Sequence, residues 1–218
     1  YARKNRSVFF SVLGVSWFWF LGSAYLTQIP NFTKEVLKGD GSVVVLLLSM
    51  FSVGIGIGSL LCEKLSGKKV ELGLVPLGSI GLSLFGADLF LAYDSPHVQG
   101  LMGIAGFIRT DGSIRVLCDL VLIGIFGGLY IVPLNAFIQI KTKPQIRGRV
   151  IAANNILNAL FMVISALAGA LLLGVANTSI PRFFLIIAVA NILVAISIYS
   201  AVPEFIKRFF AWTGFNPV

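Results

Sequence analysis

The chain has 218 residues, of which 57% are hydrophobic and only 12% are charged, and its mean hydropathy is +0.93. A soluble domain has about 25% charged residues, so this composition excludes an ordinary soluble protein and predicts a membrane protein. The net charge of +8 does not indicate nucleic-acid binding, because the basic residues stand in short clusters between apolar segments and act as topology signals.

Six apolar segments are long enough to cross a bilayer core of about 30 Å as helices of about 20 residues. The predicted spans cover residues 7–29, 42–62, 70–93, 114–140, 150–176 and 181–202. Barrel strands are excluded, because they are about 10 residues long and alternate in polarity. The sequence therefore predicts an all-α membrane bundle over residues 1–203. An interfacial tail, or a linker to a downstream domain, is expected over residues 204–218.

The distribution of Lys and Arg predicts the orientation of these spans. Five of the 17 basic residues fall on one side of the membrane: Lys34, Lys38, Arg109, Arg115 and Arg182. The other twelve fall on the side of both termini, which the positive-inside rule makes cytoplasmic.

The first span carries Tyr25 and Gln28 among its aromatic residues. Polar groups in a span face either a polar cavity or a neighbouring helix, so both residues are candidates for substrate contact. For Gln28, near the outer surface, solvation by water is the alternative. Pro30 follows and predicts the end of this helix.

The second span ends in glycines four residues apart, Gly54 and Gly58, which predict the close approach of another helix. A tight basic loop follows, and Glu63 is expected to pair with basic groups there or near Arg147. The alternative is a solvated loop whose ion pairs contribute only about 0–1 kcal/mol. The candidate gating residues are Gly58, Glu63, Lys64, Gly67, Lys68, Arg147 and Arg149.

The third span carries Asp88 close to its outer end. An intramembrane carboxylate is a functional candidate by default, and here the expected role is ion coupling. The alternative is a carboxylate that reaches the interface or caps a neighbour. In the long loop that follows, the apolar residues 101–108 are expected to lie on the outer membrane surface.

Arg115 and Asp119 in the fourth span are the best candidates for recognising a head group. They are four residues apart and so share one helical face. An arginine can hold a phosphate through two parallel hydrogen bonds, while a carboxylate can hold an ammonium group. The alternative is a salt bridge between the two side chains.

The fifth span follows a basic loop over residues 141–149 and begins with the amides Asn154, Asn155 and Asn158. These amides need partners from other helices, water or substrate, and Asn155 and Asn158 are candidates for substrate contact. The sixth span contains only Asn191 and a few hydroxyl groups, which predicts a peripheral helix.

Six spans with a glycine-ended second span and a basic loop resemble the carboxy-terminal half of a major facilitator transporter, helices seven to twelve. Residues 58–69, GSLLCEKLSGKK, are similar to that superfamily's loop signature, with Glu63-Lys64 at its acidic–basic pair and one residue inserted before Gly67. The segment RGRV at 147–150 is similar to the loop between the tenth and eleventh helices.

A closer resemblance, to the lysophospholipid transporter family, covers nearly the whole chain. It is carried by residues 62–67, 70–78, 127–139 and 149–162, and is strongest to forms fused to an acyltransferase and acyl-acyl-carrier-protein ligase. The resemblance implies a bacterial inner-membrane carrier that moves lysophospholipid, chiefly lysophosphatidylethanolamine, to the cytoplasmic side for reacylation. Its expected partners are membrane lipids and an amino-terminal six-helix half.

Two alternatives stand beside this reading: a carrier of another amphipathic small molecule, and a membrane anchor for a fused lipid-acylating enzyme. An enzyme within this chain is not expected. The single histidine, His97, is followed five residues later by Met102, so the His-x4-Asp arrangement of lipid acyltransferases is missing. No set of His and Cys ligands predicts a metal site, and no cofactor is expected.

Overall fold

The computed structural model describes residues 6–67, 69–92 and 100–214, and this part of the chain is all-helical. Lys68, a predicted gating residue, and His97 lie outside the described residues. Six helices are long and apolar enough to cross a membrane, so the predicted multi-pass helical protein is confirmed. These helices are α1 (Arg6–Asn31, extended by the π-helix η2, Phe32–Val36), α2 (Gly41–Leu65), α3 (Leu74–Leu91), α5 (Ser113–Lys141), α6 (Pro144–Gly169, extended by the π-helix η3, Ala170–Val175) and α7 (Ile180–Ala201).

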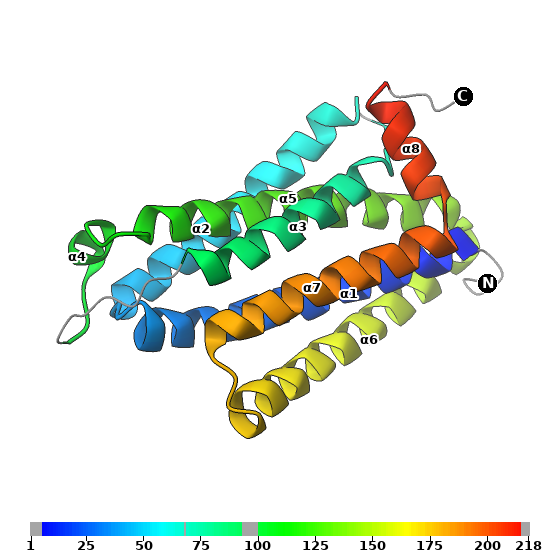
Figure 1. Ribbon diagram of the computed structural model, residues 1–218. Coiled ribbons are helices and arrows are strands. Elements are labelled where there is room, and N and C mark those ends of the chain that lie inside the picture. Colours follow the sequence, from blue (N-terminus) through cyan, green and yellow to red (C-terminus); the bar gives the residue numbers. More distant parts are fainter. Residues whose placement is uncertain (1–5, 68, 93–99, 215–218) are drawn as a thin grey trace.

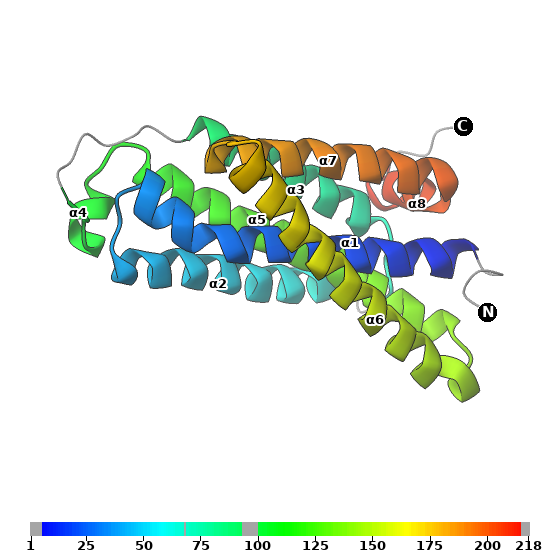
Figure 2. The ribbon, with the colours of Figure 1, turned by 90° about the horizontal axis from the view of Figure 1, so that it is seen from below.

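The six long helices run alternately in opposite directions between two ends of the bundle, at the left and right of Figure 1. The short helix α4 (Ile104–Ile108) lies at one end, which we name the α4 end. Helix α8 (Glu204–Trp212) and the start of α1 lie at the other, the α8 end. Seen from below, α6 crosses α1 and diverges from the other helices toward the α8 end (Figure 2).

Two predicted helix boundaries are wrong, and proline explains both. Helix α1 continues through Pro30 into η2. Beyond the proline, Thr33 Oγ1 donates to the carbonyl of Ile29 at 2.7 Å, and the chain continues as a π-turn. Helix α6 begins at Pro144, whose fixed φ suits the first helical position. Arg147 and Arg149 are therefore helical and do not belong to a loop.

The expectation that residues 101–108 lie on the membrane surface is only partly right. Phe107 in α4 is buried, although Leu101 and Ile108 are exposed. Met102 is fixed by two backbone hydrogen bonds, from Asp40 N to its oxygen (2.8 Å) and from its own nitrogen to Lys38 O (2.7 Å).

Asp40 also caps α2, and a hydrogen bond from the Ser42 side chain holds the pKa of Asp40 below its usual value.

Helices α2 and α5 form the most extensive contact of the bundle, along a seam of glycines. Gly54 and Gly58 of α2 face Gly124 and Gly128 of α5. A Cβ atom on Gly128 would lie 2.6 Å from Ser59 N, and one on Gly58 would overlap the carbonyl group of Ile125. Two backbones approach this closely only where no side chain separates them, so the predicted close approach of a helix at Gly54 and Gly58 is confirmed.

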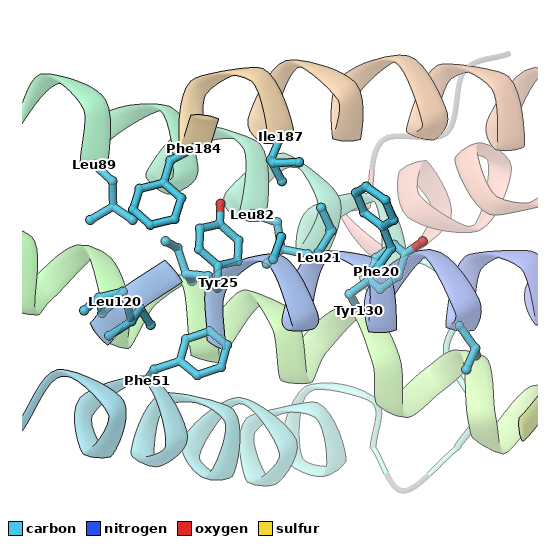
Figure 3. Close-up of a cluster of buried hydrophobic side chains, with 14 of the residues drawn as sticks. Phe20, Leu21, Tyr25, Phe51, Leu82, Leu89, Leu120, Tyr130, Phe184 and Ile187 are labelled. Atoms are coloured by element: carbon cyan, nitrogen blue, oxygen red, sulfur yellow. The ribbon is translucent and has the colours of Figure 1, made fainter. Parts of the chain in front are cut away.

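The centre of the bundle is a layer of aromatic and aliphatic side chains between α1, α2, α3, α5 and α7 (Figure 3). Tyr25 of α1 lies in this layer between Phe51 of α2 and Phe184 of α7, with ring centroids 6.4 Å and 5.3 Å away. Burial of such rings removes a large apolar area from the surroundings and fixes the spacing of the helices.

Asn191 of α7 connects three helices in this core. Its Oδ1 accepts from Trp17 Nε1 of α1 at 2.8 Å, and its Nδ2 donates to Ser79 O at 3.0 Å and to Ser83 Oγ at 2.8 Å. The side chain is only 2% exposed. The sixth span was expected to be peripheral. The face of α7 that carries Asn191 is instead buried against α1 and α3.

Candidate functional site

The strongest concentration of charge within the spans lies near the α4 end, between α3 and α5. Arg115 Nε donates to Asp88 Oδ2 at 2.9 Å, and its Nη2 donates to the other carboxylate oxygen. The pair is bidentate, which is the geometry that fixes a guanidinium most firmly against two oxygens. The side chain of Arg115 is 51% exposed and that of Asp88 is 26% exposed, so both can be reached from outside the bundle.

Asp119 lies behind this pair. It is one turn further along α5, it is 2% exposed, and its carboxyl group lies close enough to Asp88 and Arg115 to interact with both. Its Oδ2 has no hydrogen-bond partner among the described residues. A buried oxygen without a hydrogen-bond partner lowers stability. Asp119 is therefore a candidate for a role other than stabilising the fold.

The structure thus brings Asp88, Arg115 and Asp119 into one charged cluster, but not in the arrangement expected from spacing. Arg115 forms its salt bridge with Asp88 of α3 rather than with Asp119. The reason is that the close packing of α3 on α5 brings a carboxylate from another helix within reach of the guanidinium. Asp88 is engaged by Arg115 and remains partly exposed, so the alternative that it reaches the membrane interface stays open.

The amides of α6 divide between packing and exposure. Asn158 is buried and lies 3.0 Å from Ser16 Oγ of α1. With its amide oriented to satisfy every neighbour, its oxygen accepts from Trp19 Nε1 and from Asn154 Nδ2, both at 3.2 Å. Asn155, which lies beside them on the helix, is exposed. Asn158 therefore attaches α6 to α1, and it does not face an open cavity.

We expect Asn158→Leu to lower the free energy of unfolding by about 1 kcal/mol, because interhelical hydrogen bonds in membranes average about 0.6 kcal/mol and two are lost here. Asn155→Leu is the matched control, since it makes the same change three residues away on the exposed side. Unfolding in mixed micelles measures both. Equal stability of the two variants would show that the contact with Ser16 and Trp19 does not hold α6.

The two candidates on α1 have different surroundings. Tyr25 is 2% exposed and is enclosed by aromatic rings, so its side chain packs in the core here and its contact with substrate stays a prediction (Figure 3). Gln28 lines an open cleft of about 490 Å³ at the α4 end, between α1 with η2 and η3 with α7. Its Oε1 accepts from Asn31 Nδ2 at 3.3 Å, so its amide faces polar surroundings.

The predicted gating residues that the structure describes lie at the α8 end, apart from Gly58 in the seam. Glu63 and Lys64 are exposed in the last turn of α2, and Gly67 has a positive φ of 58° in the loop that follows. Among the described residues Glu63 makes no ion pair. Arg147 donates to Thr142 O at 3.5 Å, and Arg149 is exposed. The expected partners of Glu63 include Lys68, which lies outside the described residues, so the pairing stays a prediction.

Within the described ranges, no group of three or more His, Cys, Asp and Glu side chains could hold a metal ion. Cys62 and Cys118 are both free thiols.

In comparisons with known proteins, no family model, curated protein or solved structure matches the chain. The geometry of the charged cluster and the arrangement of the helices are therefore the basis for assigning a function.

Proposed function

We propose that the chain is one six-helix half of an alternating-access carrier of the major facilitator type, and that the carrier moves lysophospholipid. The observation that carries the proposal is the arrangement of the helices as two inverted three-helix units. The first unit is α1–α2–α3 and the second is α5–α6–α7.

The packing of the two units is reciprocal. Helix α2 of the first unit packs on α5 of the second, and α6 of the second packs on α1 of the first. The third helices of the units, α3 and α7, pack on each other. Because α1 and α5 start at opposite ends of the bundle, the units run in opposite directions (Figure 1). Inverted three-helix repeats of this kind are nested in each half of major facilitator transporters.

The exposed faces of α2 and α6 support the presence of a second bundle. Both helices are less buried than the other four spans. Each carries a large apolar side chain that is 71% exposed: Leu60 on α2 and Ile156 on α6. Asn155 is exposed on the same helix as Ile156. A polar amide on an exposed membrane helix favours a protein or water-lined neighbour over lipid alone.

In this proposal Arg115 and Asp88 recognise the head group. The guanidinium would exchange its bidentate carboxylate for a phosphate of similar geometry, and the released Asp88 would hold the ammonium group of ethanolamine. Asp119 is too buried to touch a ligand directly, so we assign it a positioning role behind Arg115. If the basic α8 end lies on the cytoplasmic side of a bacterial inner membrane, the charged cluster at the α4 end lies on the opposite side. It would then meet lysolipid from the outer leaflet. Reacylation by a fused acyltransferase and ligase would follow on the cytoplasmic side.

Head-group binding tests this proposal. The chain is placed in nanodiscs, and binding of lysophosphatidylethanolamine and lysophosphatidylglycerol is compared. We expect Arg115→Gln to weaken binding of both lipids about tenfold, because a charge-assisted hydrogen bond contributes about 1.5–3 kcal/mol. Asp88→Asn should reduce only the preference for the ethanolamine head group.

Arg182→Gln is the matched control, because Arg182 is also an exposed arginine at the α4 end. Thermal unfolding of each variant separates loss of binding from loss of fold. If Arg115→Gln changes binding no more than Arg182→Gln does, the cluster is structural and the head-group role is wrong.

A further inference from the structure

A long apolar groove runs along the outside of the bundle between α3 and α7, on a side that the proposed transport function does not use. It has a volume of about 550 Å³, and its walls include Ile80 and Leu84 of α3, Ile192 and Ile196 of α7, and Phe210 of α8. A second cleft of about 590 Å³ shares Ile196 and Phe210 and extends the groove to Lys207 at the α8 end. Together they form one continuous surface that is apolar along the helices and basic at one end.

The polar groups in the floor of the groove are already satisfied. Ser79 Oγ and Tyr199 OH form a hydrogen bond with each other at 2.7 Å, and Ser83 Oγ accepts from Asn191 at 2.8 Å. An occupant therefore finds hydrocarbon walls with no free donor or acceptor at the bottom. Such a surface suits an acyl chain better than a polar solute.

Helix α8 closes one end of the groove and is held firmly in place. Phe205 is fully buried against Tyr199, with the ring centroids 5.8 Å apart, and Trp212 Nε1 donates to Leu65 O at 3.2 Å. The backbone at Arg208 also approaches Gly73, where a Cβ atom would lie only 2.8 Å from the Arg208 carbonyl oxygen. These contacts fix the position of α8, so the end wall of the groove is well defined.

The charges at the mouth of the groove select the occupant. Glu204 is paired with Arg208 at 3.0 Å, whereas Lys207 is exposed and has no ion pair among the described residues. A lysine presents a point charge that binds phosphate, and clusters of basic residues beside membrane spans attract anionic lipids. With Glu204 engaged, no described residue at the mouth offers a free carboxylate to hold the ammonium group of a zwitterionic lipid.

We propose that this groove binds one acyl chain of an anionic diacyl phospholipid, such as phosphatidylglycerol, whose phosphate lies on Lys207. The lipid would lie in the leaflet at the α8 end and would brace α8 against α3 and α7. The site is separate from the charged cluster at the α4 end, so it stands whether or not the chain takes part in lysolipid transport.

Photo-crosslinking tests the site. The full chain is placed in nanodiscs of phosphatidylcholine containing a small fraction of phosphatidylglycerol with a diazirine on its acyl chain, and labelled peptides are identified by mass spectrometry. We expect labels concentrated on the walls of the groove. Ile196→Trp places a larger ring in the groove and should lower this labelling to the level found on the other lipid-facing helices, because the ring occupies the space of the acyl chain.

Two control variants make the result specific. Leu193→Trp adds the same ring to an exposed position of α7 outside the groove and should leave labelling unchanged. Lys207→Gln should reduce the preference for phosphatidylglycerol over a phosphatidylcholine probe, whereas Lys143→Gln, an exposed lysine also at the α8 end, should not. Labelling spread evenly over the lipid-facing helices, a dimer that covers the groove, or an unchanged lipid preference in Lys207→Gln would overturn the proposal.

Discussion

Gly58→Ala is expected to destabilise the bundle, although alanine is usually the better residue in a helix. A Cβ atom at this position would overlap the backbone of α5 at Ile125, so the two helices must separate. Overpacking of this kind costs about 1–3 kcal/mol, and Gly58→Leu should prevent α2 from docking at all. Unfolding in mixed micelles measures the first variant, and the yield of monodisperse protein in detergent measures the second.

Gly56→Ala and Gly56→Leu are the matched controls. Gly56 lies one half-turn away on α2, is exposed, and would place a Cβ atom in open space. Its replacement by alanine should be neutral, or stabilising by about 0.5–1 kcal/mol, because glycine is the more flexible residue in the unfolded chain. The opposite signs expected at Gly56 and Gly58 test the α2–α5 seam. If both alanine variants are stable, the helices do not approach as closely as described.

Asn191→Leu is expected to have the second large effect. The change keeps the branched shape and the number of heavy atoms of the side chain but removes its hydrogen bonds to Trp17, Ser79 and Ser83 on two other helices. At about 0.6 kcal/mol for each bond in a membrane, with values up to about 1.7, the free energy of unfolding should fall by about 2 kcal/mol. Trp17 should also show altered fluorescence, because its indole N–H loses its partner.

Ser197→Leu is the control for this change. Ser197 is exposed on the same helix and bonds only to Leu193 O of its own backbone. Its replacement should change stability by less than the replacement of Asn191. Equal effects at the two positions would show that the amide does not connect the three helices.

The number and type of the helices could be predicted, because span length and hydropathy are local properties of the sequence. The close approach at Gly54 and Gly58 was predictable for the same reason, since glycines four residues apart share one face. The contacts between residues that are far apart in the sequence could not be predicted in this way. Spacing along one helix suggested Asp119 as the partner of Arg115, whereas the actual partner is Asp88, on another helix. Only the packing of α3 on α5 brings these two side chains together.

A polar residue in a span does not reveal from sequence alone which way it faces. Tyr25 was a reasonable candidate for a cavity, but its ring lies in the aromatic core (Figure 3). Asn191 suggested a peripheral helix, because one amide among 22 residues makes α7 nearly apolar. Its burial was not evident, since its partners come from α1 and α3. A single amide in an otherwise apolar span is a signal worth weighing, because leaving it unpaired in lipid is costly.

The most direct test of the proposed carrier is translocation of lysophosphatidylethanolamine into proteoliposomes, measured by back-extraction of a fluorescent lysolipid from the outer leaflet. Alternating access requires one six-helix bundle to rock against another. We therefore expect the chain alone to translocate lysolipid no faster than protein-free vesicles. The chain together with the proposed amino-terminal six-helix half should translocate it rapidly. Rapid translocation by the chain alone, or none by the two halves together, would contradict the account.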